Sequence, residues 1–445
     1  MFKRSQLVSL AATAKQTRML DIPLRYNPFV RFAVLRRIRQ GESGDIEARR
    51  RLSGTLTAHI VEAARNTPYG RQFGRHIEDW PILRKAQLRR DPAQFVARQW
   101  ISFPASTGGT TGAPIRLVRS AECIAAEQVF LDNMLQHTGL TWRTARVASL
   151  RGEAVKPATD GSPPFGRESL GGMRLSLSTT HLNAETIGWY YERLKAFRPQ
   201  LLWAYPTFAA VLVKLLAERQ LALDIPVVLC SSERLSEDAM RLLATSFKAH
   251  VVDYYGQAER ACLSVAQAPN RHVFNPAYGR VELLPAESVE GGPGWRPMAI
   301  VATGFWNRAM PLIRYETGDY AMVPHDATEE ELEAIALGLA PFRGIAGRAE
   351  EFVYGRDGAR LAALNHIPRE IDGLLQIQIV QETLDSITIR ALASAGFGAA
   401  QQVQLAANAR AKIPSPAEIR IETVDRLETL PNGKTPFVIR RIEEP

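Results

Sequence analysis

The sequence has few of the residues that form covalent cross-links and metal clusters. Only three cysteines occur in 445 residues, Cys123, Cys230 and Cys262, and no two of them have CxxC spacing. The eight histidines are scattered, and no HExxH pattern occurs. This scarcity excludes a disulfide scaffold, a cysteine zinc cluster and a zincin-type site, and it is typical of proteins from a reducing compartment.

Long hydrophobic runs are also missing. No stretch reaches the ~18 consecutive apolar residues of a membrane-spanning helix, because charged side chains interrupt the best candidate, residues 208–230. The apolar stretch 7–12 is short and is followed closely by Lys15 and Arg18, which makes a poor signal peptide. Hydrophobic residues make up 46% of the chain and charged ones 23%, as in an ordinary globular protein. We therefore expect a cytoplasmic protein with a large core.

The net charge is +9, and much of the positive excess lies early in the chain. The basic residues of this region are Lys3, Arg4, Lys15, Arg18, Arg25, Arg31, Arg36, Arg37, Arg39, Arg49, Arg50 and Arg51. We interpret them mainly as a solvated helical face; the alternative is contact with an anionic membrane, a nucleic acid or an acidic partner. No nucleic-acid-binding motif supports that alternative, and we expect no nucleic-acid partner.

The first 100 residues are predicted to be largely helical, and a further helix is predicted over residues 121–137. From about residue 200, strands alternate with helices. Strands are predicted at 201–204, 226–230 and 250–254, with helical faces at 208–216 and 235–247. This order predicts a parallel sheet covered by helices, whose ligands bind beyond the carboxyl ends of the strands. Residues 231–233 and 255–259 follow two of these strands.

The pattern changes twice more along the chain. Residues 280–325 resemble β hairpins, whereas short alternating strands and a helix near 399–412 follow residue 350. We predict an α/β protein with a large N-terminal domain at 1–349, containing a β subdomain, and a small mobile α+β domain at 350–445.

The most distinctive stretch is Ser106–Gly112, with the sequence STGGTTG. Its glycines let the backbone approach a ligand closely, and successive N–H groups can form an anion-binding nest. A polyphosphate would suit such a loop, although no lysine follows the last glycine as in a Walker motif. Taken alone, the stretch is equally typical of a surface linker, so both interpretations stay open at this point.

Four shorter motifs follow the glycine-rich stretch. They are YYGQAE at 254–259, RYETGD at 314–319, GRAEE at 347–351 and LPNGK at 430–434. An aromatic ring can stack on a base, a carboxylate can hold Mg²⁺ against phosphate, and an aspartate can accept bonds from ribose hydroxyls. Each motif alone is typical of a solvated turn.

Taken in this order, the five motifs resemble the adenylate-forming superfamily of acyl- and aryl-CoA synthetases, nonribosomal-peptide adenylation domains and luciferases. The phenylacetate–CoA ligase branch, including its CapK-like relatives, is the most similar. Further segments that resemble this branch lie at 59–69, 80–85, 203–207 and 231–236. The resemblance covers most of the chain from about residue 55 onward.

The resemblance implies a role for each motif. The residues implied to bind the ATP phosphates are Ser106, Thr107, Gly108, Gly109, Thr110, Thr111 and Gly112. Those implied to bind adenine and ribose are Ser232, Glu233, Tyr254, Tyr255, Gly256, Asp319 and Arg348. Glu259 would hold Mg²⁺, Lys434 would be the catalytic lysine, and Glu350 would be the hinge of the mobile domain. An apolar acyl pocket could be lined by Trp203, Tyr205 and Phe208, although such residues equally form ordinary core.

The chain also departs from the family pattern. In YYGQAE, Ala258 stands where the family has a threonine. In RYETGD, Glu316 stands where the family has an arginine, and in GRAEE, Glu350-Glu351 replace a pair of aspartates. Retention of Lys434 argues against an inactive enzyme.

The resemblance implies an AMP-forming ligase that uses ATP, Mg²⁺ and coenzyme A. It would act on an aryl or short aliphatic carboxylic acid. Two alternatives remain. The acyl-adenylate could pass to an amine or hydroxyl in secondary-metabolite or surface-polysaccharide biosynthesis, or the chain could be a non-catalytic nucleotide-binding protein.

Overall fold

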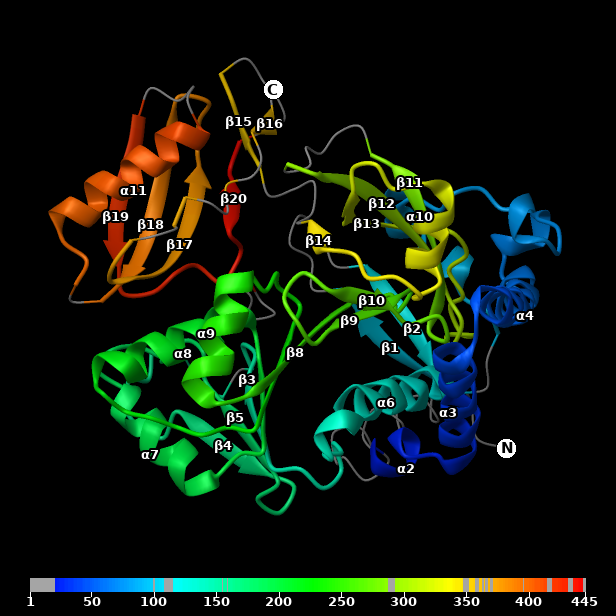
Figure 1. Cartoon of the computed structure of the whole chain (residues 1–445), viewed down its shortest axis with the longest axis horizontal. Coiled ribbons are helices and arrows are strands. Elements are labelled where there is room, and N and C mark those ends of the chain that lie inside the picture. The colour runs from blue at the N-terminus through cyan, green and yellow to red at the C-terminus, as the bar shows by residue number, and fades with distance from the viewer. Residues whose placement is uncertain are drawn as a thin grey trace.

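The computed structural model describes residues 21–98, 101–107, 115–153, 155–157, 159–286, 293–346, 352–356, 360–361, 364, 367–368, 371–394, 396–413, 418–430 and 435–442. Figure 1 shows a large N-terminal part and a smaller C-terminal part formed by α11 and its sheet. The predicted α/β fold, with a large first domain and a smaller second one, is confirmed. The boundary predicted at 349/350 lies outside the described residues and stays a prediction.

An eight-stranded sheet forms the centre of the large part. Its strands in spatial order are β10 (His272–Phe274), β9 (Leu263–Ala266), β8 (His250–Gly256), β7 (Val227–Ser231), β6 (Leu201–Ala204), β3 (Val147–Leu150), β5 (Arg174–Leu177) and β4 (Gly166–Ser169). The inner strands, from β8 to β5, are parallel, as the strand–helix alternation predicts. The strands at both edges pair antiparallel.

Helices cover both faces of this sheet because neighbouring side chains on a strand point to opposite faces. Leu202 packs in one buried cluster with helices α7, α8 and α9, whereas Leu201 packs in another with α3 and α6. The helices on the first face are α7 (Ile187–Phe197), α8 (Pro206–Glu218) and α9 (Glu237–Phe247). Those on the second are α3 (Pro28–Ser43) and α6 (Ala121–Leu135). The helices predicted around residues 121–137, 208–216 and 235–247 are thereby confirmed.

The β subdomain is an antiparallel sheet. Its strands are β11 (Gly279–Pro285), β12 (Trp295–Gly304), β13 (Tyr315–Pro324) and β14 (Gly344–Ala346). Helix α10 (Glu329–Ala336) follows β13 and begins at a Thr328 cap. The hairpins predicted for residues 280–325 are confirmed. Leu83 joins this sheet by pairing with Tyr315, which ties the N-terminal region to the subdomain.

One long helix, α4, and several short elements complete the N-terminal region. They are α2 (Asp21–Arg25), α4 (Ile46–Arg65), α5 (Lys85–Arg90), the 3₁₀ turns η1 (Gly70–Gln72), η2 (Ile77–Asp79), η3 (Pro92–Phe95) and η4 (Gln136–Thr138), and the hairpin of β1 (Ser102–Ser106) and β2 (Arg116–Ser120). Among the described residues, we find no helix that combines the length and the apolar character needed to cross a bilayer.

The C-terminal part has its own sheet and core. A small pair is formed by β15 (Val353–Tyr354) and β16 (Arg360–Leu361), and a four-stranded sheet by β19 (Glu418–Val424), β18 (Ser386–Ala393), β17 (Leu374–Gln381) and β20 (Val438–Arg440). Helix α11 (Ala399–Lys412) packs Leu405 and Ala409 into the same core as Ile379 and Ile389. Lys214 of α8 donates a 2.6 Å hydrogen bond to the carbonyl of Leu374, so the two parts touch in this structure.

Candidate functional site

The glycine-rich stretch is closed at its base by Thr107 and Ile115. Thr107 donates its N–H to the carbonyl of Ile115 (3.1 Å), and Ile115 donates its N–H to the Thr107 hydroxyl (2.9 Å). This pairing extends the β1–β2 hairpin and fixes the separation of the two ends. Of the predicted phosphate-binding residues, Ser106 and Thr107 therefore lie at the end of paired strands, and their phosphate-binding role stays a prediction.

Two of the distant motifs converge across β8 and β13. The Tyr255 hydroxyl donates a 2.9 Å hydrogen bond to Asp319, and the Tyr315 hydroxyl donates a 2.6 Å hydrogen bond to Glu259. Asp319 and Glu259 are both buried, with 7% and 8% of their surface exposed. Residues about 60 positions apart in sequence thus form one polar cluster.

The tyrosine in this cluster is held in its neutral form. Burial, followed by the negative charge of Asp319, raises the pKa of Tyr255 well above its usual value. The phenol therefore keeps its proton and donates a hydrogen bond to the carboxylate, which orients Asp319. Gln257 donates its side-chain amide to the same phenol oxygen, so the hydroxyl is held from two sides.

Left-handed backbone conformations mark three of the predicted segments. Ser232 follows β7 with φ of 72°, Arg260 follows Glu259 with φ of 57°, and Arg314 precedes Tyr315 with φ of 47°. Non-glycine residues adopt such angles rarely, and residues that do are frequent at binding sites. Arg260 forms a 2.5 Å ion pair with Glu127 of α6, which anchors the end of the segment that carries Glu259.

The turn after β7 brings Ser232 and Glu233 to the carboxyl edge of the central sheet. Glu233 accepts hydrogen bonds from the Thr207 hydroxyl (2.6 Å) and the Thr207 N–H (3.3 Å) at the beginning of α8. Its negative charge therefore lies at the positive end of a helix dipole. Ser232 is exposed and accepts a 3.2 Å hydrogen bond from Arg151.

Arg151 follows β3 and was not among the predicted site residues. Its guanidinium lies over the Trp203 ring, with 3.7 Å from the guanidinium carbon to the ring centroid, and 5.3 Å from the centroid of Tyr205. The signal in the sequence is its place directly after the apolar run at 147–150, the position where a strand of a parallel sheet ends.

The three aromatic residues of the predicted acyl pocket differ in their surroundings. Trp203 is partly exposed, whereas Tyr205 and Phe208 are buried within the core on the α7–α9 face. Tyr254 and Gly256 stand at the end of β8, next to the Asp319 cluster. Their assignment to an acyl or a nucleotide pocket stays a prediction.

Glu259 is the residue predicted to hold a magnesium ion. One of its oxygens accepts the Tyr315 hydrogen bond, and no bond to the other oxygen is found within the described residues. No group of three or more His, Cys, Asp or Glu side chains suited to a metal occurs in the described part of the chain. A single carboxylate fits Mg²⁺ that takes its remaining ligands from phosphate and water.

The cysteines do not supply a nucleophile. All three are buried, and burial raises the pKa of Cys123 to about 11 and that of Cys262 to about 12. A buried thiol of this kind carries almost no thiolate at neutral pH.

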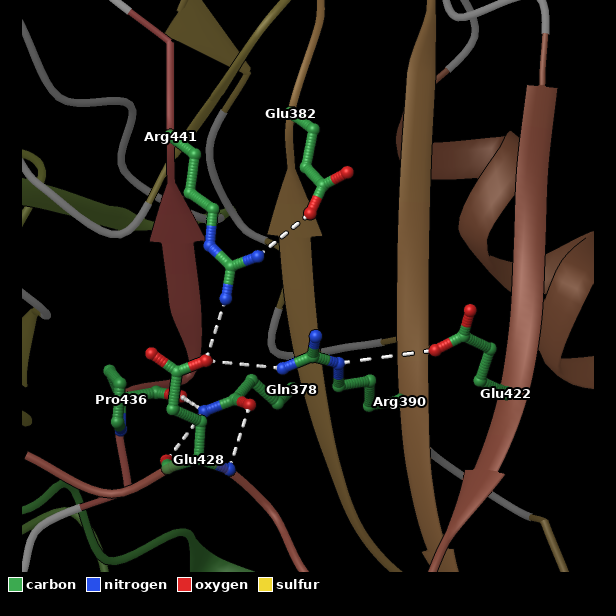
Figure 2. Close-up of polar contacts among 7 residues, drawn as sticks. All are labelled: Gln378, Glu382, Arg390, Glu422, Glu428, Pro436 and Arg441. Atoms are coloured by element: carbon green, nitrogen blue, oxygen red, sulfur yellow. Dashed lines mark hydrogen bonds and ion pairs between the residues drawn. The ribbon is translucent and has the colours of Figure 1, made fainter.

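In the C-terminal part, one buried glutamine holds both flanks of the LPNGK motif. Gln378 of β17 donates to the carbonyls of Glu428 (2.9 Å) and Pro436 (3.0 Å), and it accepts from the Glu428 N–H (3.1 Å). Figure 2 shows these bonds converging on one side chain. Gln378 has no exposed surface. The two ends of the segment that contains Lys434 are thus fixed to the central strand of the sheet.

Exposed ion pairs also hold Glu428, which lies shortly before the LPNGK motif. The Glu428 carboxylate lies between Arg390 of β18 (3.2 Å) and Arg441 (2.8 Å), and Arg441 also pairs with Glu382 (2.8 Å). Figure 2 shows this network crossing the sheet toward Glu422. Exposed pairs contribute little individually, but a network with shared partners restrains the backbone that carries it.

Several predicted site residues lie outside the described residues. They are Gly108, Gly109, Thr110, Thr111, Gly112, Arg348, Glu350 and Lys434. Their roles stay predictions.

Comparison with known proteins finds one family model, one curated relative and several solved structures that are similar to this chain. The family model of the CapK C-terminal domain matches residues 353–441. Protein CapK of Staphylococcus aureus is 21% identical over 376 residues, which cover 83% of this chain and 81% of that protein. A 2-hydroxyisobutyryl-CoA ligase in the postadenylation state, in complex with 2-HIB-AMP, is 16% identical with a TM-score of 0.61, over 88% of this chain and 89% of that chain. The same ligase in complex with R3-HIB-AMP gives a TM-score of 0.59 at 14% identity, over the same shares of the two chains. The similarity to the ligase shows a shared fold.

Proposed function

We propose that the chain is an adenylate-forming enzyme of the CapK-like branch and that it activates a carboxylic acid with ATP. The product would be an acyl-adenylate, with pyrophosphate released. The observation that carries the proposal is the joining of Tyr255 to Asp319 and of Glu259 to Tyr315 where the end of β8 meets β13 of the other sheet. An aromatic ring can stack on a base, and carboxylates can bind ribose hydroxyls and Mg²⁺.

In the adenylation step, a carboxylate oxygen attacks the α-phosphorus of ATP. The bond from that phosphorus to the bridging oxygen breaks, and pyrophosphate leaves with the electron pair. Catalysis of this reaction requires that two anions be brought together and that the developing charge be stabilised. The glycine-rich stretch 106–112 would bind the β and γ phosphates through its N–H groups and hydroxyls.

The other residues would orient the nucleotide and supply charge. Asp319, together with Arg348, would hold the ribose, and Tyr255 would stack on adenine beside Ser232. Mg²⁺ held by Glu259 would neutralise phosphate charge. Lys434 would bridge the carboxylate and the α-phosphate, and Glu350 would act as the hinge about which the small domain turns after adenylation.

We infer coenzyme A as the acyl acceptor and an aryl or short aliphatic acid as the substrate. The structural neighbours named above are a CoA ligase bound to acyl-AMP compounds, which favours this choice. The second candidate is transfer to an amine or hydroxyl. It stays a candidate because residues 353–441 match the CapK C-terminal domain and not a domain described as that of a CoA ligase.

The proposal is tested by ATP–pyrophosphate exchange over a panel of carboxylic acids. Exchange that depends on one class of acid is the expected result, and its absence with every acid would favour a non-catalytic nucleotide-binding protein. Mass spectrometry of the products, with and without coenzyme A, then separates the two acceptors. Acyl-AMP that accumulates despite coenzyme A, and that only an amine or alcohol consumes, would exclude the CoA ligase.

Replacing Asp319 with alanine is expected to raise KM for ATP by about 10- to 100-fold, because a bond to a charged group contributes about 1.5–3 kcal/mol. KM for the acid should change little. Asp326→Ala is the matched control, since Asp326 is an exposed aspartate shortly after the same strand. Equal KM values for ATP in Asp319→Ala and wild type would contradict the ribose assignment.

A further inference from the structure

Arg151 is the basic residue that the central sheet places between the predicted acyl and nucleotide residues. It lies at the carboxyl end of β3, next to β6, which carries Trp203, and β6 in turn lies next to β7, which precedes Ser232. In parallel sheets, ligands bind beyond this edge. Arg151 touches both groups of predicted residues, the aromatic ones through Trp203 and the nucleotide-lining ones through Ser232.

The guanidinium of Arg151 has no carboxylate partner within the described residues. Its one hydrogen bond there goes to the Ser232 hydroxyl, and its Nε is buried without a partner. Stacking on Trp203 satisfies the face of the guanidinium but leaves its N–H edge available. An arginine with a free planar edge suits a carboxylate, which it can bind with two parallel hydrogen bonds.

The nearby carboxylates are bonded elsewhere. Glu233 accepts from Thr207, and Glu153 accepts a 2.7 Å hydrogen bond from Ser149. Burial raises the pKa of Tyr205, the positive charge of Arg151 opposes this shift, and Glu233 and Glu153 add to it. Tyr205 therefore lies near all three charged groups, of which Arg151 is the cation.

We propose that Arg151 binds the carboxylate of the acid substrate and holds it for attack on the α-phosphorus of ATP. The inference rests on the proposed function, because it names the residue that presents the nucleophile. The place of Arg151 between Trp203 and Ser232 is the junction where the acid must meet the nucleotide. A positive charge at this junction offsets the repulsion between the carboxylate and the triphosphate, and the fixed fork orients the attacking oxygen. Arg151 is therefore a substrate-binding residue of the adenylation step.

The test compares wild type with Arg151→Met, which keeps a side chain over Trp203 but removes the charge, and with Arg151→Lys. In ATP–pyrophosphate exchange, Arg151→Met is expected to raise KM for the acid by about tenfold or more, as loss of a charge-assisted bond predicts, with KM for ATP nearly unchanged. Arg151→Lys should recover part of the loss. The matched control is Arg343→Met, because Arg343 is also stacked on a tryptophan, Trp295, but lies in the β subdomain.

Direct binding separates this inference from the proposed function. Isothermal titrations with benzoate, phenylacetate and butyrate measure carboxylate binding without turnover. Exchange activity with an unchanged acid KM in Arg151→Met would overturn the inference and leave the proposed function standing. If carboxylates bind in an Arg151-dependent way but no exchange occurs with any acid, the proposed function is overturned and carboxylate binding by Arg151 stands.

Three further results would also overturn the assignment. They are an increase in the ATP KM alone, an effect confined to dicarboxylic acids such as succinate, and the absence of binding by every probe. The second result would place Arg151 on a distal group of the substrate instead of the reacting carboxylate.

Discussion

Lys434→Ala is expected to lower the rate of ATP–pyrophosphate exchange by about 100- to 1,000-fold, the usual loss when a group that stabilises transition-state charge is removed. The expectation follows from the proposed place of Lys434 between the carboxylate and the α-phosphate, where negative charge is redistributed during the transfer. Binding of ATP should persist, because other residues would hold the base, ribose and terminal phosphates. The measurement is exchange at saturating ATP and acid, together with a titration of ATP binding.

The matched control is Lys412→Ala. Lys412 is an exposed lysine in the last turn of α11, in the same C-terminal part of the chain. The Lys412→Ala substitution should leave both the exchange rate and the melting temperature unchanged. Equal exchange in Lys434→Ala and wild type would remove Lys434 from the mechanism, whereas a lowered melting temperature would show that the residue also supports the fold.

Gln378→Leu is expected to destabilise the C-terminal part by about 2–4 kcal/mol and to lower exchange as well. The side chain makes three hydrogen bonds to the backbone of Glu428 and Pro436, and leucine would remove all three from a partly buried place, at a cost of about 1 kcal/mol for each bond. The two flanks of the segment that carries Lys434 would then be free to move. We therefore expect kcat for exchange to fall more than KM for ATP rises.

The same strand offers a control that separates stability from positioning. Gln381 is also fully buried and makes two 2.7 Å bonds, to the N–H and the carbonyl of Tyr354. Gln381→Leu should destabilise the C-terminal part by a similar amount, yet it leaves the bonds from Gln378 to Glu428 and Pro436 in place. If both variants lose exchange equally, Gln378 acts through general stability and has no specific role in placing Lys434. Unfolding is followed by denaturant titration, and exchange is measured where both variants are folded.

The regular elements could be predicted from sequence because they follow from local patterns. Leu201-Leu202-Trp203-Ala204 and Val227–Ser231 are short apolar runs, and apolar residues at helical spacing specify α8 between them and α9 after the second. Alternating strands and helices then require parallel pairing, which the structure confirms. The antiparallel edge strands β9, β10 and β4 were not predicted, since their pairing depends on contacts with neighbours distant in sequence.

The candidate site was predicted only in part. The motifs around Tyr255 and Asp319 were identified as nucleotide-binding, but their direct hydrogen bond was not, because it joins two different sheets. Arg151 and Gln378 were missed altogether. An arginine after a strand and a glutamine within one are ordinary in sequence, and their importance comes from the partners that the fold brings to them.

By itself, then, the sequence determined the order of elements, the family resemblance and the residue types available for phosphate, ribose and metal. Local propensity, hydrophobic periodicity and short motifs carry that information because they depend on neighbours within a few positions. The tertiary structure decided which side chains meet: Tyr315 with Glu259, Arg151 with Trp203, and Gln378 with both flanks of the LPNGK motif. These contacts depend on sheet order and strand register, which are set by packing across the whole chain and not by any short segment.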